Sequence, residues 1–140
     1  MSRPQLPTDS ERSALMQRVR RRGTPAEVTV AALCREIGLH YRLNVTTLPG
    51  SPDLANKAKR WAIFVNGCFW HGHKNCRLAK PPKRNREFWE RKFADNRARD
   101  ARKARELRRL GFVVAIVWQC ETTNENALSR RLQSWAKRVS

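Results

Sequence analysis

Three cysteines and a histidine have the residue types and spacing of a metal site. Cys68, His73 and Cys76 lie in one irregular stretch of 17 residues, and Cys120 directly follows a later apolar segment. Thiolate and imidazole groups in a set of four are the ligands that a structural zinc ion takes, and an irregular segment of this length needs something to hold it. The pattern predicts zinc over a chance group of buried side chains. His71 competes with His73 as the imidazole ligand, and spacing alone leaves that choice open.

Acidic residues are scarce in the central part of the chain, so their positions are informative. Between residues 28 and 86 the only two are Glu36 and Asp53, and Asp53 begins a predicted strand after a proline-containing turn. A carboxylate near a phosphate is a natural Mg²⁺ ligand, and Mg²⁺ is suited to phosphodiester hydrolysis. The pattern gives equal weight to a second interpretation, in which Asp53 completes the turn with a hydrogen bond to the backbone.

Two further residues are candidates for proton transfer. His71 can act as a general acid or base because imidazole titrates near neutral pH, and its alternative role is in or beside the zinc site. Glu27 could orient such a histidine. However, its position three residues after Thr24 fits a helix capping box, and the pattern favours that structural role.

Large aromatic side chains stand next to these polar residues. Phe69 and Trp70 follow a predicted buried strand, and such side chains can enter a base stack and deform DNA. Packing over the metal site explains them equally well. Phe88, Trp89 and Phe93 are expected mainly to form the core face of a long helix.

The charge of the chain indicates a polyanionic partner. The 140 residues include 30 Lys and Arg against 12 Asp and Glu, a net charge of +18, and half of this surplus falls between residues 77 and 110. Nucleic acid is the leading partner, with an anionic membrane surface a distant second. No apolar run is long enough to span a bilayer and no secretory signal is present, so we expect a cytoplasmic protein.

Hydrophobic periodicity predicts the elements that position these residues. Helices are expected over residues 8–20, 24–38, 85–110 and 124–138, and strands over residues 39–45, 53–55, 61–65 and 112–118. A helix between the last two strands favours a parallel crossover, hence a mixed α/β sheet covered by helices. Residues 1–140 are expected to form one domain, with residues 1–9 as a flexible arm.

Several motifs resemble those of the very short patch repair endonucleases. The resemblance rests on residues 10–135 and is strongest for a pair of strings, LPGSPD at 48–53 and IFVNGCFWHGH at 63–73. Further matches are TPAE at 24–27, REFW at 86–89, NRARD at 96–100, LGF at 110–112 and VWQC at 117–120.

The resemblance implies a restriction-endonuclease-like fold and an enzyme that nicks double-stranded DNA 5′ to the thymine of a T:G mismatch. By this resemblance Asp53 and the backbone carbonyl of Val65 hold Mg²⁺, and His71 is the general acid or base, aided by Glu27. The same resemblance implies a structural zinc ion held by Cys68, His73, Cys76 and Cys120. It also implies that four side chains enter the DNA beside the mismatch, namely Met16, Phe69, Trp70 and Trp89.

One position departs from the family pattern within the implied active site. Asn66 stands where the family often has Asp or His, which assist the metal-bound waters. An asparagine can bind a metal or hydrogen-bond to water, but it cannot accept a proton as those residues can. The sequence also lacks the Glu-x-Lys pair of many restriction enzymes.

Three functional hypotheses follow from the sequence. The leading one is a Mg²⁺-dependent DNA nicking endonuclease with a structural zinc, working as a monomer in bacterial mismatch repair near the nucleoid. The second is a zinc-stabilised DNA-binding module without catalysis. The third keeps the nuclease but changes its target to another mismatch or a modified site.

Overall fold

The computed structural model describes residues 23–139. The predicted arm (1–9), the predicted helix over 8–20 and Met16 lie outside these described residues. The described elements, in chain order, are α2 (Pro25–Glu36), β1 (Arg42–Leu43), β2 (Leu54–Asn56), β3 (Trp61–Asn66), the 3₁₀ helix η1 (Arg77–Ala79), α3 (Arg86–Arg109), β4 (Val113–Trp118), the 3₁₀ helix η2 (Gln119–Thr123) and α4 (Glu125–Val139).

The four strands form one mixed sheet in the order β1-β2-β3-β4. The first two pairings are antiparallel. β3 and β4 are parallel, from Trp61 opposite Val113 to Asn66 opposite Trp118, with α3 as the crossover between them. The predicted α/β class and the parallel crossover are therefore confirmed. Both central strands end at the same edge of the sheet, beside the Cys- and His-containing segments.

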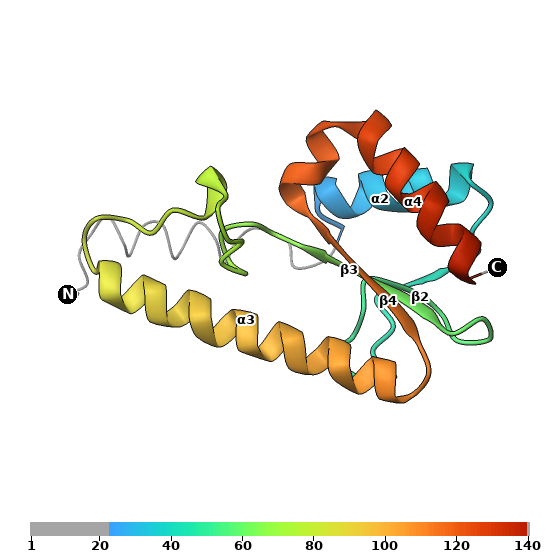
Figure 1. The fold of residues 1–140 in the computed structure, drawn as a ribbon, viewed down its shortest axis with the longest axis horizontal. Helices are drawn as coiled ribbons and strands as arrows, with labels where there is room; N and C mark the ends of the chain where they lie inside the picture. The colour runs from blue at the N-terminus through green and yellow to red at the C-terminus, as the bar shows by residue number, and fades with distance from the viewer. Residues whose placement is uncertain (1–22, 140) are drawn as a thin grey trace.

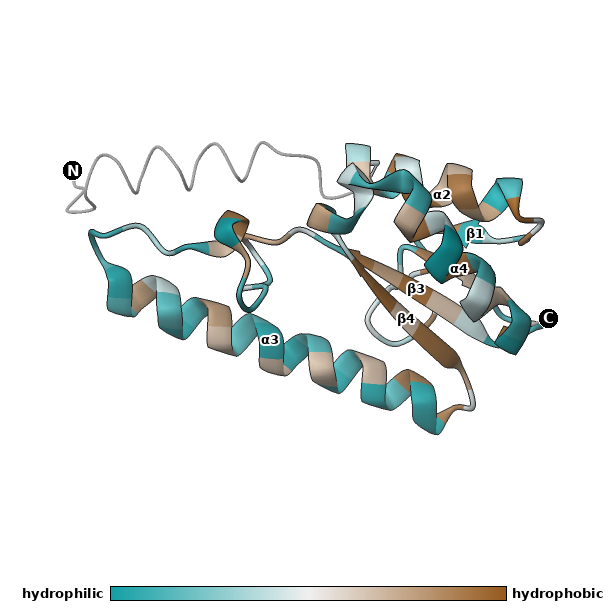
Figure 2. Ribbon diagram, turned by 45° about the horizontal axis from the view of Figure 1, so that its top comes forward, coloured by the Kyte–Doolittle hydropathy of each residue, from teal (hydrophilic) through white to brown (hydrophobic). Residues whose placement is uncertain are grey.

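Helices cover both faces of the sheet (Figure 1). Successive residues of β3 point to opposite faces: Trp61 and Ile63 pack in the cluster that includes α2 and α4, whereas Ala62 and Phe64 pack in the cluster that includes α3. Colouring by hydropathy shows the result, with apolar central strands between largely hydrophilic outer helix surfaces (Figure 2). The layers therefore run helix, sheet, helix, as the resemblance implied.

The first described helix begins and ends where the sequence predicted. The Thr24 side chain accepts a hydrogen bond from the Glu27 backbone N–H at 3.2 Å, and Pro25 occupies the first helical position. Gly38 has φ +87°, a left-handed conformation that glycine adopts without strain. The predicted N-cap at Thr24 is therefore confirmed.

The strand predicted over residues 39–45 is wrong in extent. Only Arg42 and Leu43 pair with β2, and both are exposed. Asn44 has φ +50°, which ends the extended conformation. Alternating hydrophobicity was therefore not enough to make a long strand, because the turn region that follows begins one residue after Leu43.

The long helix α3 extends beyond the sheet. Its C-terminal half packs on the sheet through Ala104 and Leu107. The segment between β3 and α3 lies beside its N-terminal half (Figure 1). Within the described residues, no helix is both long and apolar enough to cross a membrane. α3 thus connects the core to the loop that carries the candidate site.

Candidate active site and metal cluster

Asp53 lies beside the end of the central strand β3. It directly precedes β2, and its Oδ2 accepts a hydrogen bond from the backbone N–H of Val65 at 2.6 Å. Val65 is the penultimate residue of β3. Pro52, which is fully buried, fixes the chain just before the carboxylate. The two residues that the resemblance assigns to Mg²⁺ are therefore in direct contact.

The electrostatic surroundings of Asp53 bring the other predicted residues together. Burial raises the pKa of its carboxyl group to about 6, although the Val65 N–H lowers it. The Glu27 carboxylate also raises this pKa, whereas His71 and Lys103 lower it. The charges of Glu27, His71 and Lys103 therefore all act on the Asp53 carboxyl group.

Glu27 serves the helix and also faces this region. Its side chain accepts a hydrogen bond from the Gly23 N–H at 2.7 Å, so the carboxylate caps the chain just before α2. The residue is only 7 % exposed. A buried carboxylate that influences Asp53 is therefore held rigidly by the start of α2.

His71 is oriented by a residue to which the sequence analysis assigned no role. Its Nδ1 lies 2.6 Å from Oδ2 of Asp100 on α3. When Nδ1 carries the proton, its N–H donates a hydrogen bond to this carboxylate, and Nε2 is left free to accept a proton. Asp100 lies within the NRARD string, and its spacings of seven residues from Phe93 and four from Asn96 place it on the inner face of α3. That spacing is the signal that could have identified it.

Three polar residues of α3 hold the loop around His71. Asn96 donates to the carbonyl oxygen of Trp70 at 2.5 Å, and Arg97 donates to that of Gly72 at 2.9 Å. Arg99 in turn donates to Asn96. The loop backbone is therefore attached to a helix on both sides of His71, so its imidazole has a defined position.

Asn66 ends β3 at the same edge of the sheet. It is 5 % exposed and lies opposite Trp118 in the parallel pairing. Val65, next to it, is partly exposed. Asn66 thus lies between the strand that positions Asp53 and the loop that positions His71.

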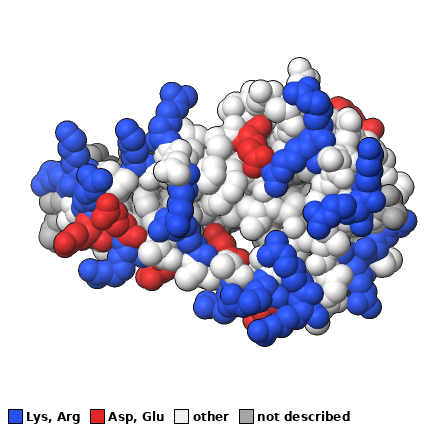
Figure 3. Space-filling view, in the orientation of Figure 1, with Lys and Arg blue, Asp and Glu red and all other residues white. Residues whose placement is uncertain are grey.

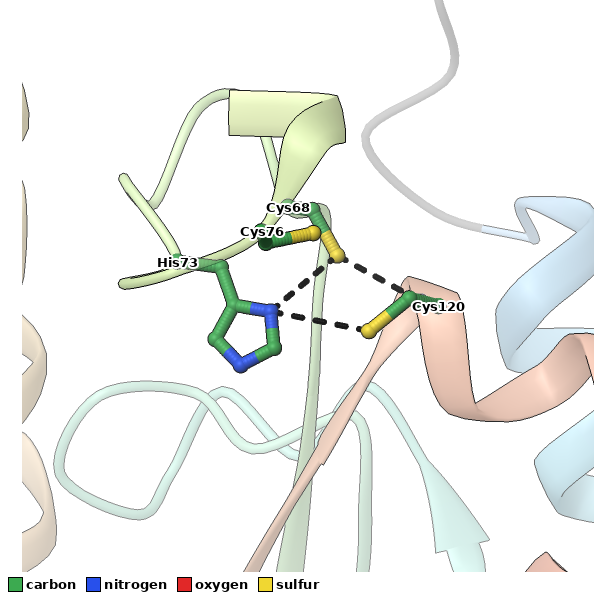
Figure 4. A group of neighbouring side chains, drawn as sticks. All are labelled: Cys68, His73, Cys76 and Cys120. Atoms are coloured by element: carbon green, nitrogen blue, oxygen red, sulfur yellow. Dashed lines mark hydrogen bonds between the residues drawn. The ribbon is translucent and has the colours of Figure 1, made fainter. Parts of the chain in front are cut away.

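The predicted metal ligands form one cluster. Potential ligand atoms of Cys68, His73, Cys76 and Cys120 all lie within 4.8 Å of one another. Nδ1 of His73 is 3.6 Å from Sγ of Cys68 and 3.5 Å from Sγ of Cys120. The side chains point toward one another from the loop after β3 and from the start of η2 (Figure 4). The structure therefore places His73 in the cluster, while His71 faces Asp100.

The surroundings of the cluster fit a cation. Burial raises the pKa of the Cys68 thiol to about 12 and also raises that of Cys120. The thiols would stay neutral at pH 7 unless a metal ion displaced their protons. The His73 ring stacks on Trp118 with the two centroids 4.0 Å apart, which fixes its orientation. A set of three sulfur atoms and one imidazole nitrogen could therefore hold a metal ion.

The candidate DNA-contacting aromatics form a cluster between the loop and α3. Phe69, Trp89 and Phe93 are buried together, and Trp70 packs against them while remaining partly exposed. The Phe69 ring centroid lies 5.3 Å from that of Trp89 and 5.1 Å from that of Phe93. The aromatic side chains therefore do pack together. Trp70, which directly precedes His71, is also exposed enough to contact DNA, so the structure is compatible with both roles that the sequence suggested.

The basic surplus lies largely on the helix that supports this loop. Between residues 77 and 110 there are 14 Lys and Arg against 5 Asp and Glu. Figure 3 shows basic side chains along α3, with acidic groups interspersed among them. A buried carboxylate, a histidine–aspartate pair and a Cys/His cluster therefore share one end of a basic α/β frame.

Comparisons with known proteins assign this frame to a family. A family model described as DNA mismatch endonuclease Vsr matches residues 5–78. The chain is 45% identical over 123 residues to the type II nicking enzyme V.XorIIP of Xanthomonas oryzae pv. oryzae, covering 88% of this chain and 90% of that protein. It is 40% identical over 129 residues to the DNA mismatch endonuclease Vsr of Escherichia coli, covering 89% and 82%. The chain belongs to the DNA mismatch endonuclease Vsr family.

Proposed function

We infer that this protein is a Mg²⁺-dependent endonuclease that nicks double-stranded DNA 5′ to the thymine of a T:G mismatch. The observation that carries this proposal is the contact of the Asp53 carboxylate with the end of β3, next to the loop that holds the His71–Asp100 pair. The charges of Glu27 and His71 also act on Asp53. Its relatives, named as mismatch endonuclease and nicking enzymes, support the same activity. The helix–sheet–helix layering supports a restriction-endonuclease-like fold in a single catalytic domain. Because the relatives are bacterial enzymes that act on DNA, we propose that the protein functions in the cytoplasm, at the nucleoid.

We propose that Asp53 and the Val65 carbonyl hold the Mg²⁺ ion, with Asn66 and Glu27 orienting the surrounding water. The donor set fits, because Mg²⁺ prefers carboxylate and carbonyl oxygens together with water. When bound, the ion polarises the scissile phosphate and activates water. Asn66 can donate from its amide or accept at its carbonyl oxygen, but it cannot take the proton. Proton transfer is therefore left to His71.

In this proposal the Nε2 atom of His71 takes a proton from the attacking water. The Nδ1–H donates to Asp100, which fixes the tautomer and stabilises the imidazolium that forms. Loop contacts from α3 keep the ring in place, as described above. Asp100 acts through His71 and is therefore a positioning residue.

Asp100→Asn should lower the single-turnover nicking rate about 100-fold, because an amide can present its N–H to Nδ1 and stabilise the wrong tautomer. Affinity for a T:G duplex without Mg²⁺ should stay close to that of the wild type. Rapid-quench kinetics at saturating enzyme measures the effect. Asp95→Asn, an exposed position on the same helix, is the control. Equal rates for both variants would remove Asp100 from the mechanism.

We propose that Cys68, His73, Cys76 and Cys120 hold a structural zinc ion. Three thiolates and one imidazole fit zinc, which takes four such ligands in closed structural sites. The ion would join the loop after β3 to the start of η2. Since His71 lies between two of the ligands in sequence, the zinc site and the active site share one loop.

The aromatic cluster is proposed to contact the DNA beside the mismatch, with Trp70 as the residue already at the surface. Contact with DNA would require Phe69 and Trp89 to leave their present packing. Met16 would approach from the opposite groove.

Trp70→Ala should reduce discrimination between T:G and T:A duplexes about tenfold. The reason is that an aromatic side chain inserts more easily between base pairs beside a mismatch than in a fully paired duplex. The comparison of single-turnover rates on the two duplexes measures this ratio. Phe88→Ala, at an exposed aromatic on α3, should leave the ratio unchanged. If Trp70→Ala keeps wild-type discrimination, Trp70 serves only packing.

Nicking assays over a panel of labelled duplexes test the proposed function. The panel contains T:G, U:G and T:A pairs in one sequence, and a single strand. We expect Mg²⁺-dependent nicking that is fastest on T:G, by a monomer because one nick needs one active site. Faster cleavage of another member would indicate a different target. Salt-sensitive binding without any nicking would indicate a DNA-binding module that lacks catalysis.

A further inference from the structure

Lys103 lies one helical turn beyond Asp100, where α3 passes the turn that leads to Asp53. Its aliphatic stem packs on Gly50: a Cβ atom at that glycine would lie 2.8 Å from both Cβ and Cγ of Lys103. Gly50 also has φ +76°, which suits glycine. The absence of a side chain at Gly50 therefore allows Lys103 to lie across the turn.

Lys103 lies beside the turn that leads to Asp53, and its charge is not consumed by an ion pair. Its stem packs on Gly50, three residues before Asp53, and it follows Asp100, the partner of His71, by one turn of α3. Among the described residues the ion pairs join His71 with Asp100, Arg86 with Glu90, and Arg131 with Glu121, and none includes Lys103. The ammonium group thus stays available to an anionic ligand beside Asp53.

The central strand provides no cation of its own. β3 carries the sequence WAIFVN, without a basic residue. Hydrolysis of a phosphodiester concentrates negative charge on the non-bridging phosphate oxygens, and a fixed cation placed there lowers the barrier. Lys103 reaches the same region from α3 instead.

We propose that Lys103 is a catalytic residue whose ammonium group binds a non-bridging oxygen of the scissile phosphate. This inference rests on the proposed nuclease function. In the step it assists, the water oxygen bonds to phosphorus and the proton of the water passes to His71. The phosphorus–oxygen bond to the leaving group breaks, and the leaving oxygen keeps the electron pair and takes a proton from solvent. Lys103 keeps its own protons and stabilises the charge on the phosphate throughout.

The kinetic test compares Lys103→Met, Lys103→Arg and the control Arg105→Met. Arg105 is exposed on the same helix and two residues away, so its loss removes the same charge from another side. At saturating enzyme and Mg²⁺, Lys103→Met should lower the nicking rate on the T:G duplex about 10- to 100-fold. Lys103→Arg should retain most of the rate, and Arg105→Met should change it less than about twofold.

A binding cycle without catalysis tests the contact itself. Each protein is titrated in EDTA with a T:G duplex and with the same duplex carrying an uncharged methylphosphonate at the scissile position. The methylphosphonate should weaken DNA binding by both proteins. The loss of affinity should be about tenfold larger for the wild type than for Lys103→Met, which has no ammonium group to lose its partner. Arg105→Met should behave as the wild type does.

The two measurements separate the outcomes. If the wild type does not nick, the proposed function fails, while the binding cycle still tests the phosphate contact. If the wild type nicks but the cycle shows no coupling to Lys103, the proposal is overturned. It is also overturned if Lys103→Arg and Lys103→Met lose the same rate together with thermal stability, because that result indicates packing on Gly50 alone.

Discussion

Asp53→Asn should lower the rate of Mg²⁺-dependent nicking by at least about 1,000-fold. The same substitution should raise the melting temperature of the metal-free protein. The first effect follows because an amide is a poor substitute for the carboxylate that we propose holds Mg²⁺. The second follows because burial, together with the charge of Glu27, raises the pKa of the Asp53 carboxyl group to about 6. At neutral pH its ionised form costs stability that a neutral amide does not.

The sign of this stability effect fixes its pH dependence. The carboxyl pKa is raised from 3.8 in the unfolded chain to about 6 in the folded one, so the folded state binds the proton more tightly. The cost of ionising Asp53 is absent below the lower value, grows between the two, and is complete above about pH 6. The gain from Asp53→Asn should therefore be about a third as large at pH 4.5 as at pH 7.5, where it should reach several degrees.

Thermal melts in EDTA at these two pH values, with single-turnover nicking at pH 7.5, test both halves of the prediction. Asp95→Asn on the exposed surface of α3 should change neither quantity appreciably. A stabilised but inactive Asp53→Asn variant would show that the carboxylate is kept for chemistry. A variant that nicks at the wild-type rate would exclude Asp53 as an essential Mg²⁺ ligand.

Cys120→Ala should release the zinc ion, lower the melting temperature by about 10 °C and reduce nicking severely. Cys120 is the proposed ligand outside the loop, so its loss detaches η2 from the segment that carries His71. Binding free energy at a structural zinc site is folding free energy, which is why the stability loss should be large.

Cys34→Ala provides the matched control for the metal site. Cys34 is a fully buried thiol on α2 and belongs to the hydrophobic core. Its variant should keep one zinc ion per chain by elemental analysis and should keep nicking activity. If Cys120→Ala also retains a full zinc complement, or if purified wild type contains none, the four residues do not form a structural zinc site.

Much of the fold could be predicted from the sequence, because interactions between residues close in the chain determine where its helices and strands begin. The Thr24 N-cap started α2 where expected, and the continuous apolar run from Trp61 marked the central strand. The helix between the last two strands made the parallel crossover predictable. The strand over residues 39–45 failed because the conformation of Asn44, set by the following turn, overrode the alternating pattern.

The candidate site was predictable in its residue types but not in its pairings. Spacing could not choose between His71 and His73, because the choice depends on how the loop folds against α3. The structure turns His73 onto Trp118 and His71 onto Asp100. Asp100 and Lys103 were missed for the same reason: they lie far along the chain from Asp53, and only packing of α3 brings them to it.

One measurement tests the central claim most directly: mapping the product of a single T:G duplex labelled separately on each strand. With Mg²⁺ we predict one cut, immediately 5′ to the mismatched thymine, with the opposite strand intact and no product in EDTA. Absence of Mg²⁺-dependent cleavage by folded, zinc-containing protein, or cleavage of both strands, would contradict the account.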